Sequence, residues 1–371
     1  KKAEVKSIPK QGVGTQSVNK QGGSGKNGLK NVSILHCGGT IASKVDYSTG
    51  AVKAKFTPEE LLEMFPELVE IVNLRSKLVA NMLSENMRFA HYNLIAREIE
   101  QEVNSGCEGI IITHGTDTLH YTAAALSFIL ENLNVPVLLV GAQRSSDRGS
   151  SDAFLNLKCA TQFIAKSNFK GVGICMHASA DDDWCAILPG IKSRKMHSSR
   201  RDAFKAINSS AYALVDTNGK IEWLKNYSSE NVENKLVVGK KLVLKLFNEK
   251  LKIGILKAHP QMFVGEFKSY VKYDGLILEG TGLGHLPIEN YDANTKEHEL
   301  IFKEVEKLAR KIALVMCTQT IFGVVNMNVY SPGRRLLQAG VLGNEMDLSA
   351  ESAFIRLGWL LSNYSAVKVK E

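Results

Sequence analysis

The sequence predicts an α/β protein with two doubly wound, mostly parallel domains. Short β-rich runs recur along the chain with helical patterns between them, and most of these runs are continuously apolar, as in strands covered on both faces. A chain of 371 residues, 44% of them hydrophobic, is long enough for two or three domains with sizeable cores. The repetition of strand, helix and strand therefore favours parallel sheets joined by crossover helices.

Seven runs are predicted strands and four segments are predicted helices. The strands lie at residues 32–36, 109–113, 136–140, 171–176, 252–256, 275–278 and 312–316. Three of the helices lie at residues 118–132, 152–166 and 295–310. Asn294 and Glu297 are expected to cap the last of these. The fourth helix is expected to begin at Thr57, with Pro58 at its first position and Glu60 closing a capping box.

Composition divides the chain into four parts. Residues 1–30 are rich in Gly, Gln, Ser and Lys and have no aromatic residue, so a flexible linker or tail is expected there. Residues 31–225 are predicted to form the larger α/β domain, which carries the active site, and residues 251–371 the smaller one. Residues 226–250 break the pattern and predict a connection with one extra strand.

The positive charge of the chain is concentrated in its tail. Seven lysines and one glutamate among residues 1–30 account for +6 of the formal net charge of +8, so the rest carries only about +2. This distribution argues against an extended nucleic-acid groove. The six cysteines have no Cys-x-x-Cys spacing, which predicts reduced thiols in a cytoplasmic protein and no zinc site. No apolar run approaches the roughly 18 residues of a membrane span, so no membrane contact is expected.

Two turns that follow predicted strands are candidates for a ligand site. Gly38-Gly39-Thr40 follows the first strand, and Gly115-Thr116-Asp117 follows the second and opens a helix. Ligands of open parallel sheets bind beyond the carboxyl ends of the strands, so neighbouring strands would bring Thr40 and Thr116 to one pocket. Each turn alone is also consistent with a simple turn or a helix cap. The sequence has no Gly-x-x-x-x-Gly-Lys-Ser/Thr motif, and no Gly-x-Gly-x-x-Gly follows the first strand.

Together, the two turns resemble the signature motifs of the bacterial-type L-asparaginases. More narrowly, the chain resembles the D component of the archaeal glutamyl-tRNA(Gln) amidotransferases over nearly all of residues 31–371. The segments that carry the resemblance are residues 38–42, 44–52, 83–87, 114–118, 141–147, 194–204, 279–285 and 326–335. The resemblance implies an asparaginase-like fold and hydrolysis of a side-chain carboxamide with release of ammonia. That family also carries a small N-terminal domain, so a truncated form is expected here.

The resemblance assigns catalytic roles to five residues. Thr40 is the expected nucleophile, and Tyr47, on a loop that closes over the site, is the expected acceptor of its proton. Thr116, Asp117 and Lys195 form a second set, in which Lys195 activates Thr116 or a water molecule. The order in which the two threonines act stays open at this point. Lys195 also lies in a run of basic residues, which alone would indicate a solvated face.

The same resemblance assigns substrate contacts and partners. Ser84 and Glu85 are expected to hold the α-carboxylate and α-ammonium groups of Gln or Asn, with Gly39 and Ala142 as further contacts. A homodimer core within a heterotetramer is implied, in which a partner subunit, the E component of the amidotransferase, uses ATP and magnesium and binds most of the Glu-tRNA(Gln). No cofactor or metal is expected on this chain. A free-standing L-asparaginase and a non-catalytic amino-acid-binding module are the alternatives.

Overall fold

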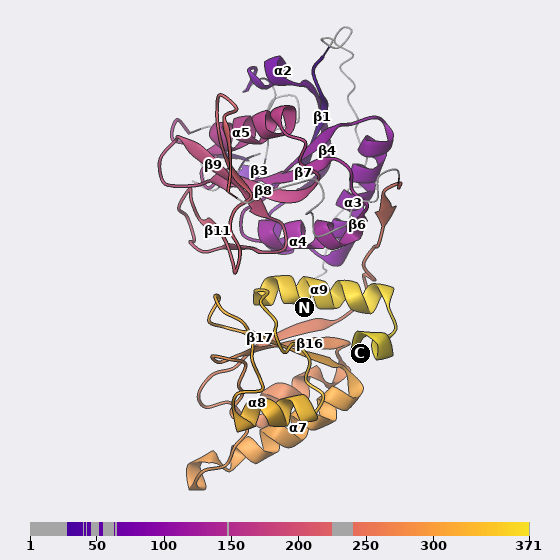
Figure 1. The fold of residues 1–371 in the computed structure, drawn as a ribbon, viewed down its shortest axis with the longest axis vertical. Helices are drawn as coiled ribbons and strands as arrows, with labels where there is room; N and C mark the ends of the chain where they lie inside the picture. Colours follow the sequence, from indigo (N-terminus) through magenta and orange to yellow (C-terminus); the bar gives the residue numbers. More distant parts are fainter. Residues whose placement is uncertain are drawn as a thin grey trace, which may run out of the picture.

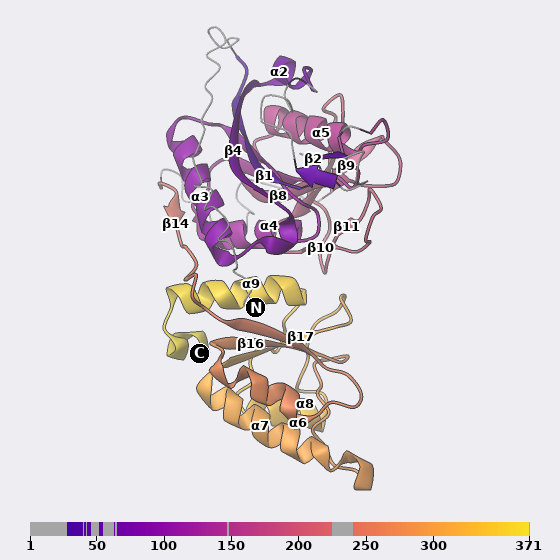
Figure 2. The same ribbon diagram turned by 180° about the vertical axis from the view of Figure 1, so that it is seen from behind.

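The computed structural model describes residues 28–39, 41, 43–45, 52–54, 63, 65–146, 148–224 and 240–370 (Figure 1). These residues form two α/β bodies stacked end to end (Figures 1 and 2). The upper one holds the strands up to residues 221–223 and also the short strand at residues 243–244, and the strands of the lower one begin at residue 253. The capping box predicted at residues 57–60 lies outside the described residues. Among the helices of the described ranges, none combines the length and apolar composition needed to cross a bilayer.

The upper body is built on an eight-stranded sheet of order β13-β12-β9-β8-β7-β5-β1-β4. Its strands are β1 (Asn31–Gly38), β4 (Asn73–Met82), β5 (Gly109–Thr113), β7 (Pro136–Val140), β8 (Gly171–His177), β9 (Trp184–Pro189), β12 (Ala213–Asp216) and β13 (Ile221–Trp223). The five strands from β4 to β8 in this order are parallel, and the remaining pairs are antiparallel. The predicted mostly parallel α/β fold is thereby confirmed.

The central strands are apolar throughout because helices cover both faces of the sheet. Ile110 and Ile112 of β5 pack on one face with α3 (Phe89–Asn104) and α4 (Leu119–Ile129). Ile111 points to the other face, where α2 (Leu68–Ile71) and α5 (Ala153–Lys166) lie. Successive side chains of a strand alternate between faces, so a doubly covered strand needs apolar residues at every position.

The order of the strands reverses between β1 and β5. From β1 the chain moves outward to β4 at the sheet edge, then returns to β5 on the other side and continues to β7 and β8. β1 and β5 are parallel and pair in register from Val32↔Gly109 to His36↔Thr113. Their carboxyl ends therefore open at a topological switch point, where ligands of such sheets bind.

The lower body has a three-stranded parallel sheet with helices on both faces. Its strands are β15 (Ile253–Lys257), β16 (Gly275–Gly280) and β17 (Ala313–Thr318). One face packs against α6 (Val264–Lys268), α7 (Glu297–Lys311) and α8 (Ser331–Gln338). The other face packs against α9 (Ala350–Asn363), which lies between the two bodies (Figures 1 and 2). α10 (Ala366–Lys370) follows α9.

Short elements complete the structure. They are the strand pairs β2 (Ser43–Val45) with β3 (Val52–Ala54), β6 (Leu130–Glu131) with β14 (Val243–Leu244), and β10 (Ser193–Lys195) with β11 (Phe204–Ala206), and the 3₁₀ turns η2 (Ser84–Asn86), η3 (Ser269–Lys272) and η4 (Ala293–Thr295). The predicted cap of α7 is wrong. The Asp292 carboxylate accepts from the backbone N–H groups of Asn294 (2.8 Å) and Thr295 (3.1 Å), so Asn294 lies inside the turn that Asp292 caps.

Candidate active site

The two glycine turns predicted to converge lie against each other. Gly39 has φ +83°, and a Cβ there would stand 2.3 Å from the backbone nitrogen of Gly115. A Cβ on Gly38 would stand 2.5 Å from the backbone nitrogen and oxygen of Met82. Only glycine permits both this left-handed conformation and this close approach of backbones. The carboxyl ends of β1, β4 and β5 are thereby packed into one cluster.

Lys195 joins the β5 turn from a segment far away in the sequence. Its Nζ donates to Thr116 Oγ1 at 2.8 Å and to Asp117 Oδ1 at 2.7 Å. The Lys195 side chain is 10% exposed and that of Asp117 is 67% exposed, so the carboxylate faces solvent and the amine lies beneath it. This geometry lets a proton pass between the hydroxyl and the amine, while the carboxylate fixes the amine.

The predicted substrate-binding segment is attached to the same turn. The backbone N–H of Thr118 donates to Ser84 Oγ at 3.3 Å, and Thr118 Oγ1 donates to the backbone oxygen of Ser84 at 2.6 Å. A Cβ on Gly115 would stand 2.8 Å from Ser84 Oγ. Ser84 is buried and Glu85 is exposed, so of these two neighbours Glu85 has its side chain open to solvent.

The loop after β7 lies on the other side of Thr116. A Cβ on Gly141 would stand 2.7 Å from Thr116 Cγ2, and the next residue, Ala142, is fully buried. Thr116 Oγ1 donates to Gln143 Oε1 at 3.5 Å. Because these neighbours leave Thr116 only 7% exposed, its hydroxyl is shielded from bulk water.

Two side chains at the start of α5, one just before the helix and one in its first turn, fix this loop, and the sequence prediction missed both. The Asp152 carboxylate accepts from the backbone N–H groups of Gln143 (3.0 Å) and Arg144 (3.1 Å). Asn156 Nδ2 donates to the backbone oxygen of Gly141 at 3.0 Å. Their only signal in the sequence is their place at the start of a predicted helix, which does not distinguish a loop anchor from an ordinary cap.

Thr40 and Tyr47 lie outside the described residues. The residues on either side of Thr40, Gly39 and Ile41, are both buried. The Ser146 hydroxyl donates to the backbone oxygen of Ile41 at 2.7 Å. The chain that flanks Thr40 is therefore anchored both to the β5 turn and to the segment after β7.

Two neutral histidines support the strands that end at the site. Burial lowers the pKa of His36 and the pKa of His114 to about 4. His36 hydrogen-bonds with Thr113 Oγ1 (2.9 Å) and Ser76 Oγ (2.8 Å), and so links β5, β1 and β4. His114 hydrogen-bonds with the backbone oxygen of Gly115 (2.7 Å) and with Thr122 Oγ1 (2.9 Å). Within the described ranges, no three His, Cys, Asp or Glu residues are grouped as metal ligands.

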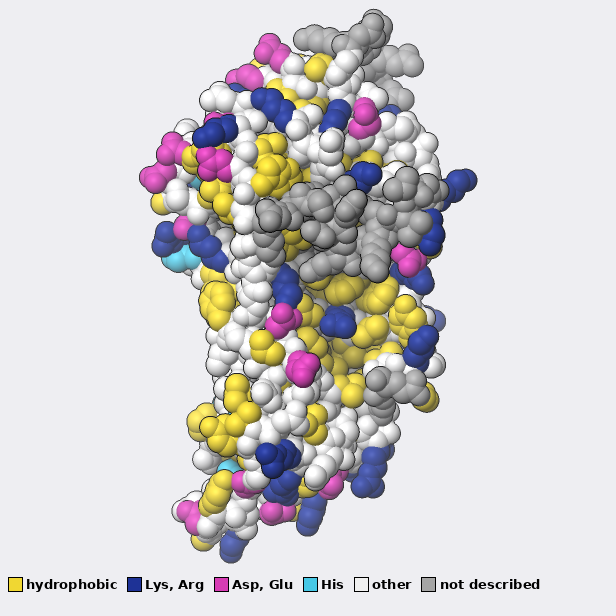
Figure 3. Space-filling model, in the orientation of Figure 1, with side chains coloured by type: hydrophobic (Ala, Val, Ile, Leu, Met, Phe, Trp, Pro, Cys, Tyr) yellow, Lys and Arg dark blue, Asp and Glu magenta, His cyan; other side chains and the backbone are white. Residues whose placement is uncertain are grey.

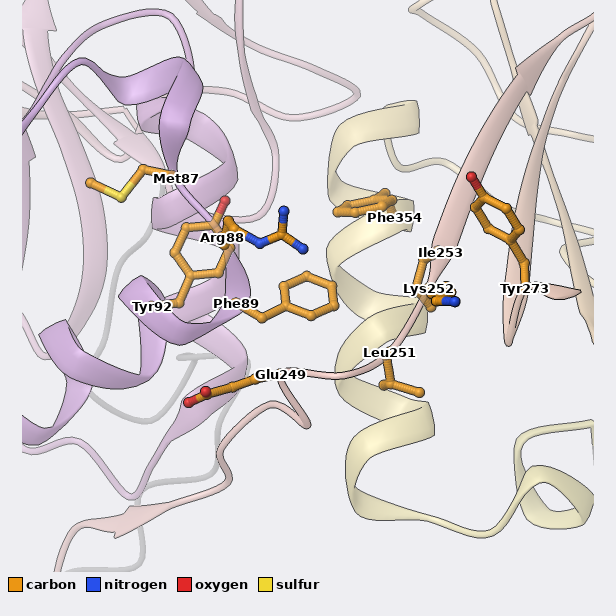
Figure 4. A pocket seen from close by; sticks show the side chains of 10 residues that line it. All are labelled: Met87, Arg88, Phe89, Tyr92, Glu249, Leu251, Lys252, Ile253, Tyr273 and Phe354. Atoms are coloured by element: carbon orange, nitrogen blue, oxygen red, sulfur yellow. The ribbon is translucent and has the colours of Figure 1, made fainter. Parts of the chain in front are cut away.

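A separate groove of about 310 Å³ lies between the bodies (Figure 4). Met87 and Arg88, directly after η2, line this groove. Its aromatic lining residues include Phe89 from α3 and Phe354 from α9. Phe89 stacks on Phe247 with ring centroids 4.6 Å apart. None of the predicted site residues lines this groove, so it is distinct from the cluster around Thr116.

Comparison with known proteins places this geometry in context. Residues 31–229 match the family model "Asparaginase, N-terminal", and residues 252–370 match "Glutaminase/Asparaginase C-terminal domain". The chain is 46% identical to the D component of the glutamyl-tRNA(Gln) amidotransferase of Thermococcus kodakarensis, over 92% of this chain and 74% of that protein. The protein of the same name from Methanococcus maripaludis is 45% identical, over 92% and 78%.

Solved structures resemble the whole two-body arrangement. The thermostable L-asparaginase from Thermococcus kodakarensis matches with a TM-score of 0.76 and 26% identity, over 92% of this chain and 95% of that one. The probable cytoplasmic L-asparaginase from Campylobacter jejuni matches with a TM-score of 0.74 and 25% identity, over 92% and 98%.

Proposed function

Because this chain belongs to the asparaginase family, we propose that it is the glutaminase subunit of a tRNA-dependent amidotransferase. It releases ammonia from the side-chain carboxamide of Gln, or of Asn. A partner subunit uses that ammonia to convert Glu-tRNA(Gln) to Gln-tRNA(Gln). The observation that carries the proposal is the contact of Lys195 Nζ with both Thr116 Oγ1 and Asp117 Oδ1, beside the glycine turn that leads to Thr40.

In the proposed reaction Thr40 is the nucleophile. Its hydroxyl oxygen attacks the carboxamide carbon while Tyr47 accepts the proton, because a threonine hydroxyl needs a base at neutral pH. The C–N bond breaks, and the nitrogen takes up the proton that Tyr47 accepted and leaves as ammonia. Water then hydrolyses the acyl ester, which restores the hydroxyl and yields the free carboxylate. In this second half Thr116, Asp117 and Lys195 activate the water.

The surroundings of Thr116 supply the remaining groups. The backbone N–H of Thr116 is the proposed oxyanion donor, and the loss of such a donor in other enzymes costs roughly 3–4 kcal/mol of barrier. The backbone oxygen of Ala142 accepts from the carboxamide nitrogen. Ser84, Glu85 and Gly39 hold the α-carboxylate and α-ammonium ends, and Asp117 also pairs with the ammonium.

The relatives named as amidotransferase components support the assignment to a complex over a solitary enzyme. We propose the E component of the amidotransferase as the partner, with a homodimer of this chain at the centre of a heterotetramer. In this proposal the partner subunit binds and uses ATP and magnesium, and this chain binds no cofactor. On the face in Figure 3, basic and acidic side chains are interspersed, which fits tRNA contact made mainly through the partner. Six buried free thiols fit a cytoplasmic location.

A free-standing L-asparaginase is the second candidate, because both solved structures reported above carry that title. Ammonia release from Gln and from Asn, each with and without the E component and Glu-tRNA(Gln), separates the two. We expect slow release by the chain alone and faster release in the complex, because uncoupled ammonia is wasted. Rapid asparagine hydrolysis that ignores the partner favours the second candidate.

Variants test the proposed chemistry in the same assay. Thr116→Ala and Lys195→Met are each expected to lower kcat by roughly 10³-fold with the fold intact, because they remove the group that activates water. Thr40→Ala is expected to abolish turnover. The matched controls are Thr161→Ala, whose hydroxyl donates to the backbone oxygen of Leu157 within α5, and Lys77→Met, whose amine pairs with Glu98. Near-normal turnover of Thr116→Ala would remove the second set from the mechanism.

A further inference from the structure

The hairpin that carries Lys195 is attached to the lower body. β10 and β11 pair from Ser193↔Ala206 to Lys195↔Phe204. Lys195 occupies the last position of β10, so its amine stays at Thr116 only while the hairpin holds its place. Successive residues of a strand point to opposite faces, and Arg194 therefore points away from Thr116.

Arg194 makes an ion pair across the boundary between the bodies. Its Nε donates to Glu351 Oε1 at 2.9 Å, and Glu351 lies in the first turn of α9. The side chains are 27% and 13% exposed, so the pair is largely withdrawn from solvent. A charge in such a place is costly when its partner is removed.

The groups around the pair leave Glu351 dependent on Arg194 for its counter-charge. His120 of α4 is 5% exposed, and burial lowers its pKa to about 4, with Arg194 and Lys195 acting in the same direction and Glu351 opposing them. The histidine is thus neutral at pH 7 and does not compensate Glu351. Within the described part of the chain, Glu351 Oε2 has no hydrogen-bond donor, so Arg194 supplies the direct compensation of this carboxylate.

Two further contacts tie the same hairpin to the lower body. Lys192, immediately before β10, pairs with Asp347. Asn208, shortly after β11, donates to the backbone oxygens of Gly323 (2.9 Å) and Asp347 (2.8 Å) and accepts from the backbone N–H of Gly323 at 2.8 Å. Both ends of the hairpin are therefore held, and Arg194 is the anchor beside the amine.

We infer that Arg194 and Glu351 are positioning residues that hold Lys195 Nζ within hydrogen-bonding distance of Thr116 Oγ1. The inference rests on the proposed function, since it assigns Lys195 a part in turnover. It makes the first turn of α9 in the lower body a determinant of chemistry in the upper body. Neither residue touches substrate, and each acts through the hairpin.

The test compares Arg194→Met, Glu351→Gln and the double variant in the assembled complex. Each single variant is expected to lower kcat by at least tenfold with KM within about threefold, because an ångström of misplacement costs roughly 10²-fold. The double variant is expected to match the singles, since either change removes the same pair. Arg194→Lys, which keeps the charge, is expected to restore part of the rate. Glu98→Gln, in an ion pair with Lys77 that is also largely withdrawn from solvent but lies away from the site, is the matched control.

Amide hydrogen exchange gives a readout that does not need turnover. Arg194→Met and Glu351→Gln are expected to speed exchange at residues 193–206, and Glu98→Gln is not. Unchanged kcat or unchanged exchange in both variants overturns the inference, as does a loss confined to KM or losses that add in the double variant. If the unaltered complex releases no ammonia, the proposed function fails, and the inference, which assigns Lys195 a part in that reaction, falls with it.

Discussion

At the scale of single residues, three buried histidines near the site stay unprotonated at neutral pH. His36, His114 and His120 are buried, and burial lowers the pKa of each to about 4. Each ring is neutral in the folded chain, whereas it binds a proton near pH 6.5 when the chain unfolds. Between about pH 4 and pH 6.5, protonation of these histidines therefore favours the unfolded state.

Acid is expected to destabilise the chain through these histidines. The unfolded state binds more protons below pH 6.5, so the free energy of unfolding is fully retained above that pH and falls as the pH drops toward 4. Lowering the pH from 7.5 to 5 is expected to remove about 2 kcal/mol per histidine. Urea unfolding of His114→Asn at both pH values is expected to show a correspondingly smaller loss.

His259→Asn is the control for this measurement. Its exposed ring has a raised pKa, caused by the backbone oxygen of Pro260 and by Glu266, and so acts in the opposite direction. Its removal should not weaken the acid loss. An equal loss in His114→Asn and the unaltered chain would mean that His114 is charged when folded.

At the scale of elements, the site depends on how closely turns approach. Gly39 and Gly106 share φ +83°, but only at Gly39 would a Cβ meet another backbone, that of Gly115 at 2.3 Å. Nothing lies within 4 Å of a Cβ on Gly106. Comparing alanine variants at the two positions therefore separates the cost of the left-handed conformation from the cost of a clash with the neighbouring backbone.

Gly39→Ala is expected to lower kcat by roughly 100-fold and to destabilise the fold, because the β1 and β5 turns must move apart. Gly106→Ala carries only the strain of the left-handed conformation, about 1–2 kcal/mol, and should keep its turnover. Ammonia assays and urea unfolding of both variants measure the difference. Equal turnover in the two variants would show that the approach of the turns is unimportant.

The sequence predicted those elements whose residues follow one local rule. Buried parallel strands such as β5 are continuous apolar runs, and the prediction placed it correctly. β4 was missed, because a ten-residue edge strand with mixed exposure has no such pattern. Lys195 meets Thr116 from 79 residues away, which no spacing rule reveals, and only the family resemblance brought them together. The Arg194–Glu351 contact has no signal in the sequence at all.

At the scale of the whole molecule, α9 belongs to both bodies. Ile355 packs in the core with α3 and α4, while Ala353 and Leu357 on the other face pack against the sheet of the lower body. A single helix shared by two cores couples their stability, because neither core is complete without it.

Ile355→Ala is expected to lower the free energy of unfolding by about 2–5 kcal/mol, whereas Ile355→Val costs about 0.5–1.5 kcal/mol, since the cavity is smaller. Calorimetry is expected to show one transition for the unaltered chain and for both variants. Two resolved transitions in the unaltered chain would contradict the coupling.

The place of α9 in the chain has a consequence for biosynthesis. Thr116 and Lys195 emerge from the ribosome well before Glu351, which follows every strand of both sheets. Under the proposed function, a growing polypeptide already contains Thr116 and Lys195 but lacks the ion pair inferred to align them. Ammonia release is therefore expected only after α9 has been translated, so that a nascent chain ending before Glu351 does not consume free glutamine.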